Sequence, residues 1–437
     1  MTVDDLRARI TNLDHEIVLQ QQLLQKLKKD RCFAKRELNA VLDPVACLPL
    51  ELSSEIFLQC LDPVPQVGAH CTPMLFLNVC HAWSDIALST PLLWASIGIF
   101  FPRAPNFQTL LRLWLRRAND YPLSISLTGL FDYAVVSDIW EHSAQITHLD
   151  ICLDDSDRDE DEDSDQEYYP EYELWHPEAT GPELLPSLKT LTIRAGAGEC
   201  RSLSLSSAHL HRLLNLSPNL IECVFRDVIS VGDAQELLLL PSLRRLEFKQ
   251  SSECPYLEDG FLKSLSLPGL QVLSASFSAL HDWEILEFLE RSSPPLREFC
   301  LGRLMKLATL EKCLQLLPDL SHFEIRWRDL SEVQELLLML SNSYSLISRI
   351  HTFVVDVDTF RIIDKDFSAA LWRDLSALLT TRRTHLHQFH IIFPLPLSYS
   401  HMLPIPPDTH RVFKELVATG TDVRFTSPRT GWIYSWD

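Results

Sequence analysis

The sequence is poor in glycine, with twelve in 437 residues, and it contains no GxSxG elbow, no glycine-rich phosphate loop with its lysine and no HExxH motif. Few positions therefore allow the close approach of backbone that a nucleotide or an acyl intermediate requires. These absences argue against the common hydrolase, nucleotide-binding and metalloprotease classes. We expect a protein that is not itself an enzyme and that needs no cofactor.

Long apolar runs are also missing. The longest ones, such as Leu237–Leu240, are far shorter than the roughly 20 residues of a membrane-spanning helix, and the N-terminus alternates charges where a secretory signal is apolar. We therefore expect no membrane partner and a cytoplasmic or nuclear location. The 11 cysteines include no CxxC pair, which fits buried thiols in a reducing compartment better than disulfides or a zinc ribbon.

Positive charge is scarce, because 39 lysines and arginines face 59 aspartates and glutamates, for a net charge of -20. Nonspecific affinity for nucleic acid comes from cations that replace counterions, so a nucleic-acid partner is not expected. Much of the imbalance is local: residues 154–173 hold twelve acidic side chains and one arginine, Arg158. Such a segment has little to bury, and we predict a disordered acidic loop.

The acidic loop begins like a calcium-binding loop, with Asp157-x-Asp159-x-Asp161, but Glu162 stands where that loop requires glycine. We therefore reject an EF-hand. Three roles stay open: the loop screens a basic surface of the same molecule, it is phosphorylated at Ser156 and Ser164, or it is solvated padding.

Residues 1–42 carry apolar side chains at alternating steps of four and three, which is heptad spacing. The positions are Leu6, Ile10, Leu13, Ile17, Gln20, Leu24, Leu27, Arg31, Ala34 and Leu38. The polar Gln20 and Arg31 weaken this seam. Two interpretations are equally good: a homodimeric coiled coil through this helix, or a single helix that folds back on its own protein.

Residues 45–98 predict a compact unit of three short helices. Leu52, Ile56 and Phe57 form an apolar stripe of helical period, preceded by Leu48-Pro49. A second helix follows from the spacing of Phe76, Val79, Cys80 and Trp83. Thr90-Pro91 should begin a last turn that packs Leu93 and Trp94 onto the other two helices. Cys80 should be buried and unreactive.

This unit resembles an F-box, of the fungal, basidiomycete-like branch of that family. The resemblance is carried by Leu48-Pro49-x-Glu51-Leu52, Ile56-Phe57, Val79-Cys80-x-x-Trp83 and the run from Ile86 to Trp94. It implies that the unit docks on a Skp-family adaptor and, through it, on a cullin-RING ubiquitin ligase. The adaptor-facing and supporting positions would include Leu48, Pro49, Leu52, Ile56, Phe57, Val79 and Trp83. A longer interruption, Asp62 to Pro73, departs from the family pattern.

Residues 106–437 contain a recurring L-x-x-L-x-L pattern, most copies following a proline. The clear copies open at Leu188, Leu220, Leu243, Leu270, Leu296 and Leu320, and weaker ones at Ile146, Ile350 and Leu386. Each copy supplies one short strand, followed by helices such as Ala234–Leu240 and Trp283–Glu290, and one copy alone cannot bury its apolar face. We therefore predict an α/β fold with a leucine-rich-repeat-like solenoid. The asparagine expected after each strand is absent, so the repeats should be irregular.

Strand alternation sends the sixth residue after each opening leucine outward, where Arg194, Arg226, Lys249 and Arg326 stand. We interpret them as a basic stripe that faces a protein substrate; the alternative is a solvated strand face with chance charges. His385-x-His387 projects two imidazoles to one face but lacks a third ligand nearby, so no metal site is expected. Two hypotheses result: a substrate-receptor subunit of a Skp-cullin-F-box ligase, or a non-catalytic scaffold that dimerises through the N-terminal helix.

Overall fold

Two units make up the chain, Met1–Ser126 and Leu127–Asp437. The computed structural model describes residues 3–68, 70–101, 107–129, 133–153, 184–196, 203–231, 236–249, 261–275, 281–302, 305–327, 330–343, 346–357, 365–392, 405–427 and 431–432. Within these ranges, no helix combines the length and the apolarity needed to cross a lipid bilayer.

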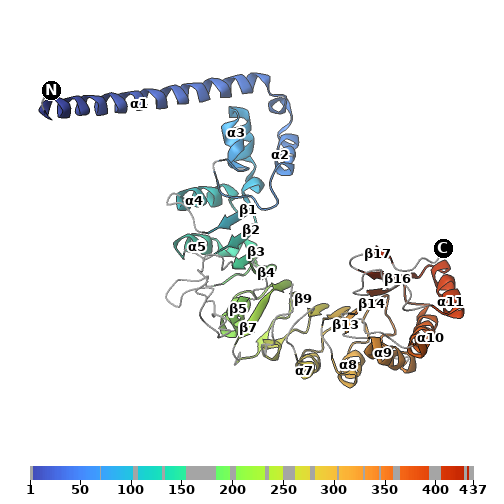
Figure 1. Cartoon of the computed structure of the whole chain (residues 1–437). Coiled ribbons are helices and arrows are strands. Elements are labelled where there is room, and N and C mark those ends of the chain that lie inside the picture. Colours follow the sequence, from blue (N-terminus) through green and yellow to red (C-terminus); the bar gives the residue numbers. More distant parts are fainter. Residues whose placement is uncertain are drawn as a thin grey trace. The chain divides into compact units, whose positions relative to one another are not determined.

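The first unit opens with one long helix, α1 (Val3–Leu42), as the heptad pattern predicts (Figure 1). Forty helical residues extend over about 60 Å at the usual rise per residue. Its C-terminal turns attach to the rest of the unit: Arg36 donates to the carbonyl of Leu77 at 2.8 Å, and Asn39 donates to that of Val79 at 3.0 Å. Both of these contacts anchor the helix at its C-terminal end.

Five short helical segments follow α1. They are the turn η1 (Val45–Cys47), α2 (Leu50–Gln59), the turn η2 (Met74–Asn78), α3 (His81–Ser89) and the final turn η3 (Pro91–Trp94). Of these, α2, η2 and α3 share one aromatic core. The predicted second helix is wrong in one respect, because it breaks at Val79 and Cys80 between η2 and α3. Cys80 is extended there, and its sulfur accepts the backbone N–H of Trp83 at 3.5 Å as the N-cap of α3.

The last turn packs as predicted, since Leu93 and Trp94 are fully buried and Pro91 opens η3. The Trp94 indole donates to the carbonyl of Ala87 at 2.9 Å, which ties the turn to α3. The interruption between α2 and η2 is also held in place. Val67 is buried, and the Gly98 N–H donates to the Pro65 carbonyl at 2.6 Å.

The first unit ends in β1 (Ser96–Phe100), α4 (Phe107–Ala118) and β2 (Leu123–Thr128), which runs across the boundary between the units. The amphipathic pattern of α4 buries Leu111, Trp114 and Leu115. The Trp114 indole donates to the Trp94 carbonyl at 2.8 Å, and the two rings meet edge to face at 5.2 Å. This contact fixes α4 on the helical segments.

The second unit is a row of mostly parallel strands, in which the first nine strands follow the nine predicted copies and the last two follow no predicted copy. In spatial order they are β3 (Ile146–Leu153), β4 (Thr190–Ala195), β6 (Glu222–Arg226), β9 (Arg245–Lys249), β11 (Val272–Ala275), β12 (Glu298–Leu301), β13 (His322–Trp327), β14 (Thr352–Val357), β15 (Gln388–Ile392), β16 (Asp422–Ser427) and the antiparallel β17 (Gly431–Trp432). Spatial order follows chain order, as in a solenoid.

Helices connect these strands. They are α5 (Tyr133–Trp140) with the turn η4 (Ser143–Gln145), α6 (Ser207–Asn215), α7 (Asp282–Ser292), α8 (Leu307–Gln315), α9 (Leu330–Asn342), α10 (Lys365–Arg382) and α11 (Pro407–Ala418). Consecutive helices from α7 to α11 contact one another along the same side of the strand row (Figure 1). The mixed α/β architecture with a long parallel sheet is thus confirmed.

Two further strand pairs lie outside the main row, β5 (Leu203–Ser206) with β7 (Val228–Val231) and β8 (Leu238–Leu239) with β10 (Leu265–Ser266), which follows the turn η5 (Phe261–Ser264). The predicted helix over Ala234–Leu240 is therefore wrong. Leu238 is buried while Leu237 and Leu239 are exposed, which is the alternation of a strand. A short leucine run has no periodicity that separates the two structures.

The core of the repeat unit is built from the predicted leucines and from a line of phenylalanines. The opening residues of the copies, such as Leu188, Leu220 and Leu320, are fully buried. Further along the row, four neighbouring strands each bury one phenylalanine in register with the next, and we call these the aromatic column: Phe299, Phe323, Phe353 and Phe389. The centroids of successive rings are 6.1, 5.6 and 5.6 Å apart. Neighbouring repeats therefore close one continuous core.

Candidate functional site

An apolar patch on α2 is the first candidate, and we name it the α2 patch: Leu48, Pro49, Leu52 and Ile56. Leu52 and Ile56 are one helical turn apart and so lie on the same face of α2. Their exposed fractions are 55% and 40%, Leu48 is 40% exposed, and Pro49 at the N-cap is also exposed. A short helix that turns such side chains to solvent has surface left for a second molecule.

The other predicted adaptor positions support this patch from beneath. Phe57 is 1% exposed, and its ring contacts Phe76 at 4.4 Å and Trp83 at 4.8 Å. The Trp83 indole donates to the Asp43 carboxylate, and Val79 is half-buried. The sequence stripe thus divides into two faces: Leu52 and Ile56 point outward and Phe57 points inward. Sequence periodicity alone cannot make that division.

The predicted cations do align on the sheet. Arg194 on β4 is the register partner of Arg226 on β6, which is the register partner of Lys249 on β9. Arg326 lies on β13, several strands away. Arg226 and Lys249 are exposed and Arg194 and Arg326 are half-buried, so the alternation that places these residues outward is confirmed.

The prediction that they form a basic stripe is wrong, because carboxylates of the same face neutralise most of them. Arg194 pairs with Asp150 at 3.0 Å, and this hydrogen bond raises the pKa of the guanidinium. Arg326 pairs with an aspartate of the next strand, Asp356, at 2.8 Å. Arg226 is exposed and makes no ion pair among the described residues.

Glu247 lies at the centre of this ion-pair network. It accepts from Arg245 at 2.6 Å and pairs with Lys249 at 2.5 Å. Burial alone raises the pKa of the Glu247 carboxyl, but the hydrogen bonds from Lys249 and Arg245 outweigh it, so the pKa lies below its ordinary value. Arg245 also lies 3.9 Å from Glu222 and from Glu298. The sheet face is a mixed, paired surface.

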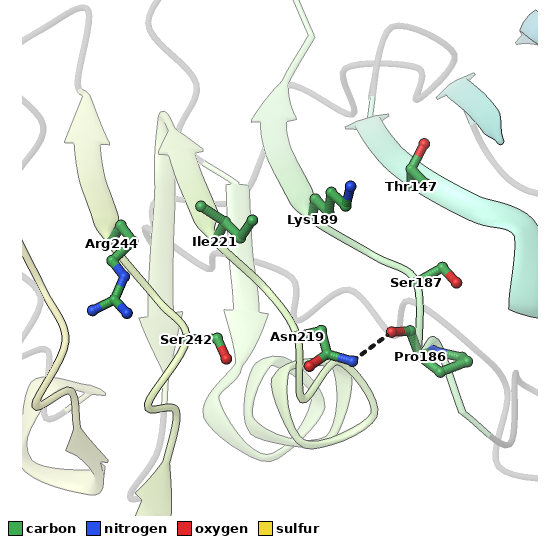
Figure 2. Close-up of a pocket in the computed structure, with 8 residues that line it drawn as sticks. All are labelled: Thr147, Pro186, Ser187, Lys189, Asn219, Ile221, Ser242 and Arg244. Atoms are coloured by element: carbon green, nitrogen blue, oxygen red, sulfur yellow. Dashed lines mark hydrogen bonds between the residues drawn. The ribbon is translucent and has the colours of Figure 1, made fainter.

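A groove at the amino-terminal edge of the strands is the second candidate (Figure 2). Its volume is about 560 Å³ and its lining residues are Thr147, Pro186, Ser187, Lys189, Asn219, Ile221, Ser242 and Arg244. Asn219 donates to the Pro186 carbonyl at 2.8 Å, which joins two successive repeats. These lining residues include two cations and no carboxylate. The groove therefore has the excess positive charge that the predicted stripe lacks.

Sequence reasoning missed this groove, although a signal exists. Lys189 and Arg244 each stand one place after an opening leucine, immediately before a strand. The outward places within the strands give no sign of it, because both cations lie in the turns that precede the strands. Arg244 also donates to the Gly269 carbonyl at 2.7 Å, so its guanidinium is fixed by the next repeat.

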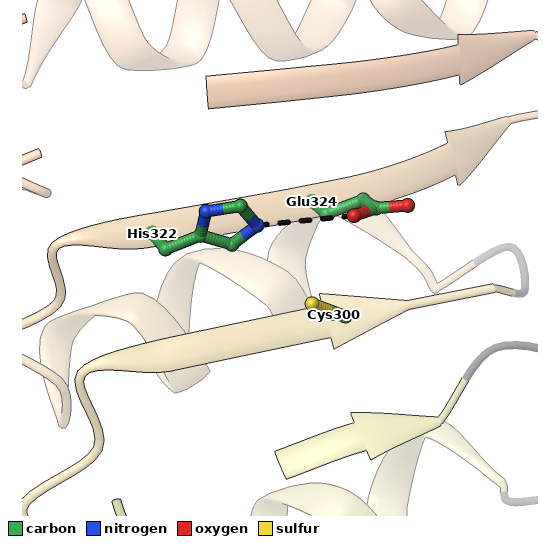
Figure 3. Close-up of side chains that lie close together, drawn as sticks. All are labelled: Cys300, His322 and Glu324. Atoms are coloured by element: carbon green, nitrogen blue, oxygen red, sulfur yellow. Dashed lines mark ion pairs between the residues drawn. The ribbon is translucent and has the colours of Figure 1, made fainter. Parts of the chain in front are cut away.

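A third cluster brings together Cys300 on β12 with His322 and Glu324 on β13 (Figure 3). Their ligand atoms all lie within 4.8 Å of one another. Thiolate, imidazole and carboxylate are ligands that zinc accepts, and three of them leave one position of a tetrahedral site open. Burial, with Glu324 and Glu298, raises the pKa of the Cys300 thiol to about 12. The thiol must lose that proton before it can bind a metal.

The remaining predicted features have these positions. His387 is exposed and its ring stacks on His351 of the neighbouring repeat at 5.2 Å, and His385 is exposed. The cysteines within the described ranges are free thiols, of which Cys80, Cys152, Cys223 and Cys313 are buried and Cys32, Cys47 and Cys60 are exposed. The acidic loop over 154–173 lies outside the described residues.

Neither the protein-family models nor the curated proteins that were compared give a match. Among solved structures, the chain is similar to the crystal structure of a TLR13-ssRNA13 complex, with 12% sequence identity and a TM-score of 0.33. That match covers 76% of this chain and spans 45% of the other.

Proposed function

We propose that this chain is the substrate-receptor subunit of a ubiquitin ligase of the Skp-cullin-F-box type. In this proposal the first unit binds a Skp-family adaptor and the repeat unit binds a protein target. The observation that carries it is the α2 patch: Leu52 and Ile56 are exposed on a helix whose opposite side, at Phe57, is locked into an aromatic core. These are the residues that resemble the F-box.

Apolar side chains that stay in water forgo the free energy that burial would give them. Burying a leucine or isoleucine side chain is worth about 1.5 to 3 kcal/mol. A small unit that leaves several of them in water, at the same time as it buries Trp94 and Trp114 completely, has apolar surface that a partner can cover. An adaptor that supplies an apolar groove of the same length as α2 would gain this energy.

The chain would contribute no bond-making residues of its own under this proposal. Its role would be to hold a target beside an enzyme, so that their encounter becomes intramolecular and the effective concentration rises. The groove supports a target segment of acidic character, because Lys189 and Arg244 line it without a carboxylate. The paired sheet face would contribute shape and hydrogen bonds more than net charge.

The test is complex formation between the purified full-length chain and a purified Skp-family adaptor, followed by gel filtration. We expect one adaptor per chain. A variant carrying Leu52→Glu and Ile56→Glu should not bind, whereas a variant carrying Glu55→Lys, an exposed residue of the same helix outside the resemblance motif, should bind, keep its helical content and serve as the matched control. Absence of a complex with the wild-type chain would refute the proposal.

A second function has one observation in its favour. The apolar seam of α1 is exposed throughout, which suits a non-catalytic scaffold that dimerises through that helix and has no role in a ligase. The two functions differ in a single measurement, since the scaffold predicts no affinity for the adaptor at any concentration.

A further inference from the structure

The heptad seam of α1 is open to solvent along its whole length. The a positions are Val3, Ile10, Ile17, Leu24, Arg31 and Leu38, and the d positions are Leu6, Leu13, Gln20, Leu27, Ala34 and Val41. The exposed fraction of Ile10 is 57%, that of Ile17 is 53%, and that of Leu27 is 57%. An isolated helix gains nothing from such a stripe, so the stripe requires a partner.

The attachment of α1 to its own unit leaves this seam free. Arg36 and Asn39, which donate to the carbonyls of Leu77 and Val79, occupy positions f and b of the heptad. These positions lie on the side of the helix away from a and d. Among the α1 side chains that the structure describes, Arg36 alone is half-buried and the others are exposed. The helix is therefore not folded back onto the unit through its apolar side.

Charge complementarity identifies the partner as a second copy of the same helix. In a parallel pair in register, each g residue faces the e residue five places later on the other chain. Arg9 then faces Asp14, Asp30 faces Lys35, and the other g–e pairs contain at least one uncharged residue. Each attractive pair occurs twice by symmetry, and no like charges meet at these positions.

The antiparallel alternative is less favourable. In an antiparallel pair with full overlap, the a residues of one chain pack against the d residues of the other. The g residues of the two chains then face each other, and so do the e residues. Glu16 then meets Asp30, and Arg7 meets Lys35, both with like charge. These repulsive pairs offset the attraction that the same arrangement creates elsewhere.

The seam composition also selects two strands. Val3, Ile10 and Ile17 are β-branched residues at a, and Leu6, Leu13 and Leu27 stand at d, which is the combination that favours parallel dimers. The polar residues set the register. In a parallel pair Arg31 faces Arg31 of the second copy across the seam. It also lies next to Asp30 of that copy, so its charge has a partner.

We infer that two copies of this chain associate through α1 as a parallel, in-register, two-stranded coiled coil. The inference goes beyond the proposed function and does not depend on it, because it uses neither the α2 patch nor the repeat unit. In a parallel pair, the C-terminal ends of both α1 helices lie together. A dimeric receptor would then present two target-binding units for every assembly, and bivalent targets would be held more tightly than either unit alone could hold them.

The experiment measures the mass of the full-length chain in solution by light scattering or sedimentation. The wild type should have twice the 50.1 kDa of one chain. The seam variant, Ile17→Glu with Leu24→Glu, should be monomeric. The matched control, Val18→Glu with Leu19→Glu, changes two residues of similar exposure, 49% and 50%, at outer heptad positions, and should remain dimeric. A monomeric wild type, or a seam variant that stays dimeric, would overturn the inference.

Orientation is tested by oxidation of a Leu13→Cys variant in which the exposed Cys32 is replaced by serine. At a d position of a parallel pair, residue 13 meets its own copy within reach of a disulfide, whereas in the antiparallel pair it meets Arg31. A covalent dimer that depends on residue 13 is expected. Dimers that fail to cross-link there, but do cross-link in a mixture of Leu13→Cys and Arg31→Cys chains, would overturn the parallel register. Adaptor binding by the seam variant separates this result from the fate of the proposed function.

Discussion

Truncating Leu52 and Ile56 together to alanine should weaken the binding of a Skp-family adaptor about 30-fold while leaving the unit folded. Leu52 exposes 55% of its surface and Ile56 exposes 40%, so an adaptor that covers them buries roughly half of each side chain. Complete burial is worth about 1.5 to 3 kcal/mol, and half of that is about 1 kcal/mol for each residue. The sum of about 2 kcal/mol corresponds to the 30-fold change, since about 1.4 kcal/mol is a factor of ten.

Titration calorimetry with the full-length chain and purified adaptor provides the assay, and a denaturation curve of each variant provides the control. Alanine is a good helix former and both sites face solvent, so the unfolding free energy should change by no more than about 0.5 kcal/mol. Phe57→Ala gives the opposite pattern: it should cost about 3 to 5 kcal/mol of stability, because the ring is buried between Phe76 and Trp83. Unchanged affinity in the double variant would refute the reasoning.

Two further predictions concern the repeat unit. Glu247→Gln should lower the urea midpoint at neutral pH. The difference from the wild type should shrink as the pH falls below about 4.3, the ordinary glutamate value. The lowered pKa of Glu247 means that its stabilisation is complete above that value and is lost when the folded form takes up a proton; a difference that stays constant with pH would contradict this. Gly269→Ala should lower the thermal midpoint, since a Cβ there would overlap the Pro241 carbonyl oxygen, at a cost of about 1 to 3 kcal/mol. Differential scanning calorimetry would detect the shift, and an unchanged midpoint would count against the packing described for this turn.

The parts of the fold that sequence predicted well are those with a strict period. The heptads of α1 repeat often enough to fix the helix. The opening leucines at 188, 220, 243, 270, 296 and 320 repeat often enough to fix each strand and its buried side. Short segments without a period were less predictable. The run at Leu237–Leu240 became a strand, and the second helix of the first unit broke at Cys80, where an extended residue caps α3.

The candidate surfaces could be predicted only in part, because a surface depends on neighbours from other strands. Arg194 and Arg326 point outward as alternation requires, yet Asp150 and Asp356 of adjacent strands neutralise them. Those partners lie 44 and 30 residues away in the chain. The groove has the same origin, since Lys189 and Arg244 come from different repeats. Aligning the repeats on their opening leucines would have brought these residues together.

The aromatic column carries a consequence for how such a chain can change length. Phe299, Phe323, Phe353 and Phe389 each stand three places after the opening residue of their copy, so the joint between one copy and the next is nearly the same each time. Deletion of residues 299–322 would seat Phe323 against Leu273, where Phe299 now lies. Unequal recombination could therefore remove or insert a whole copy and still place equivalent residues of neighbouring copies in contact. The length of the strand row would change, while its core would keep the same composition.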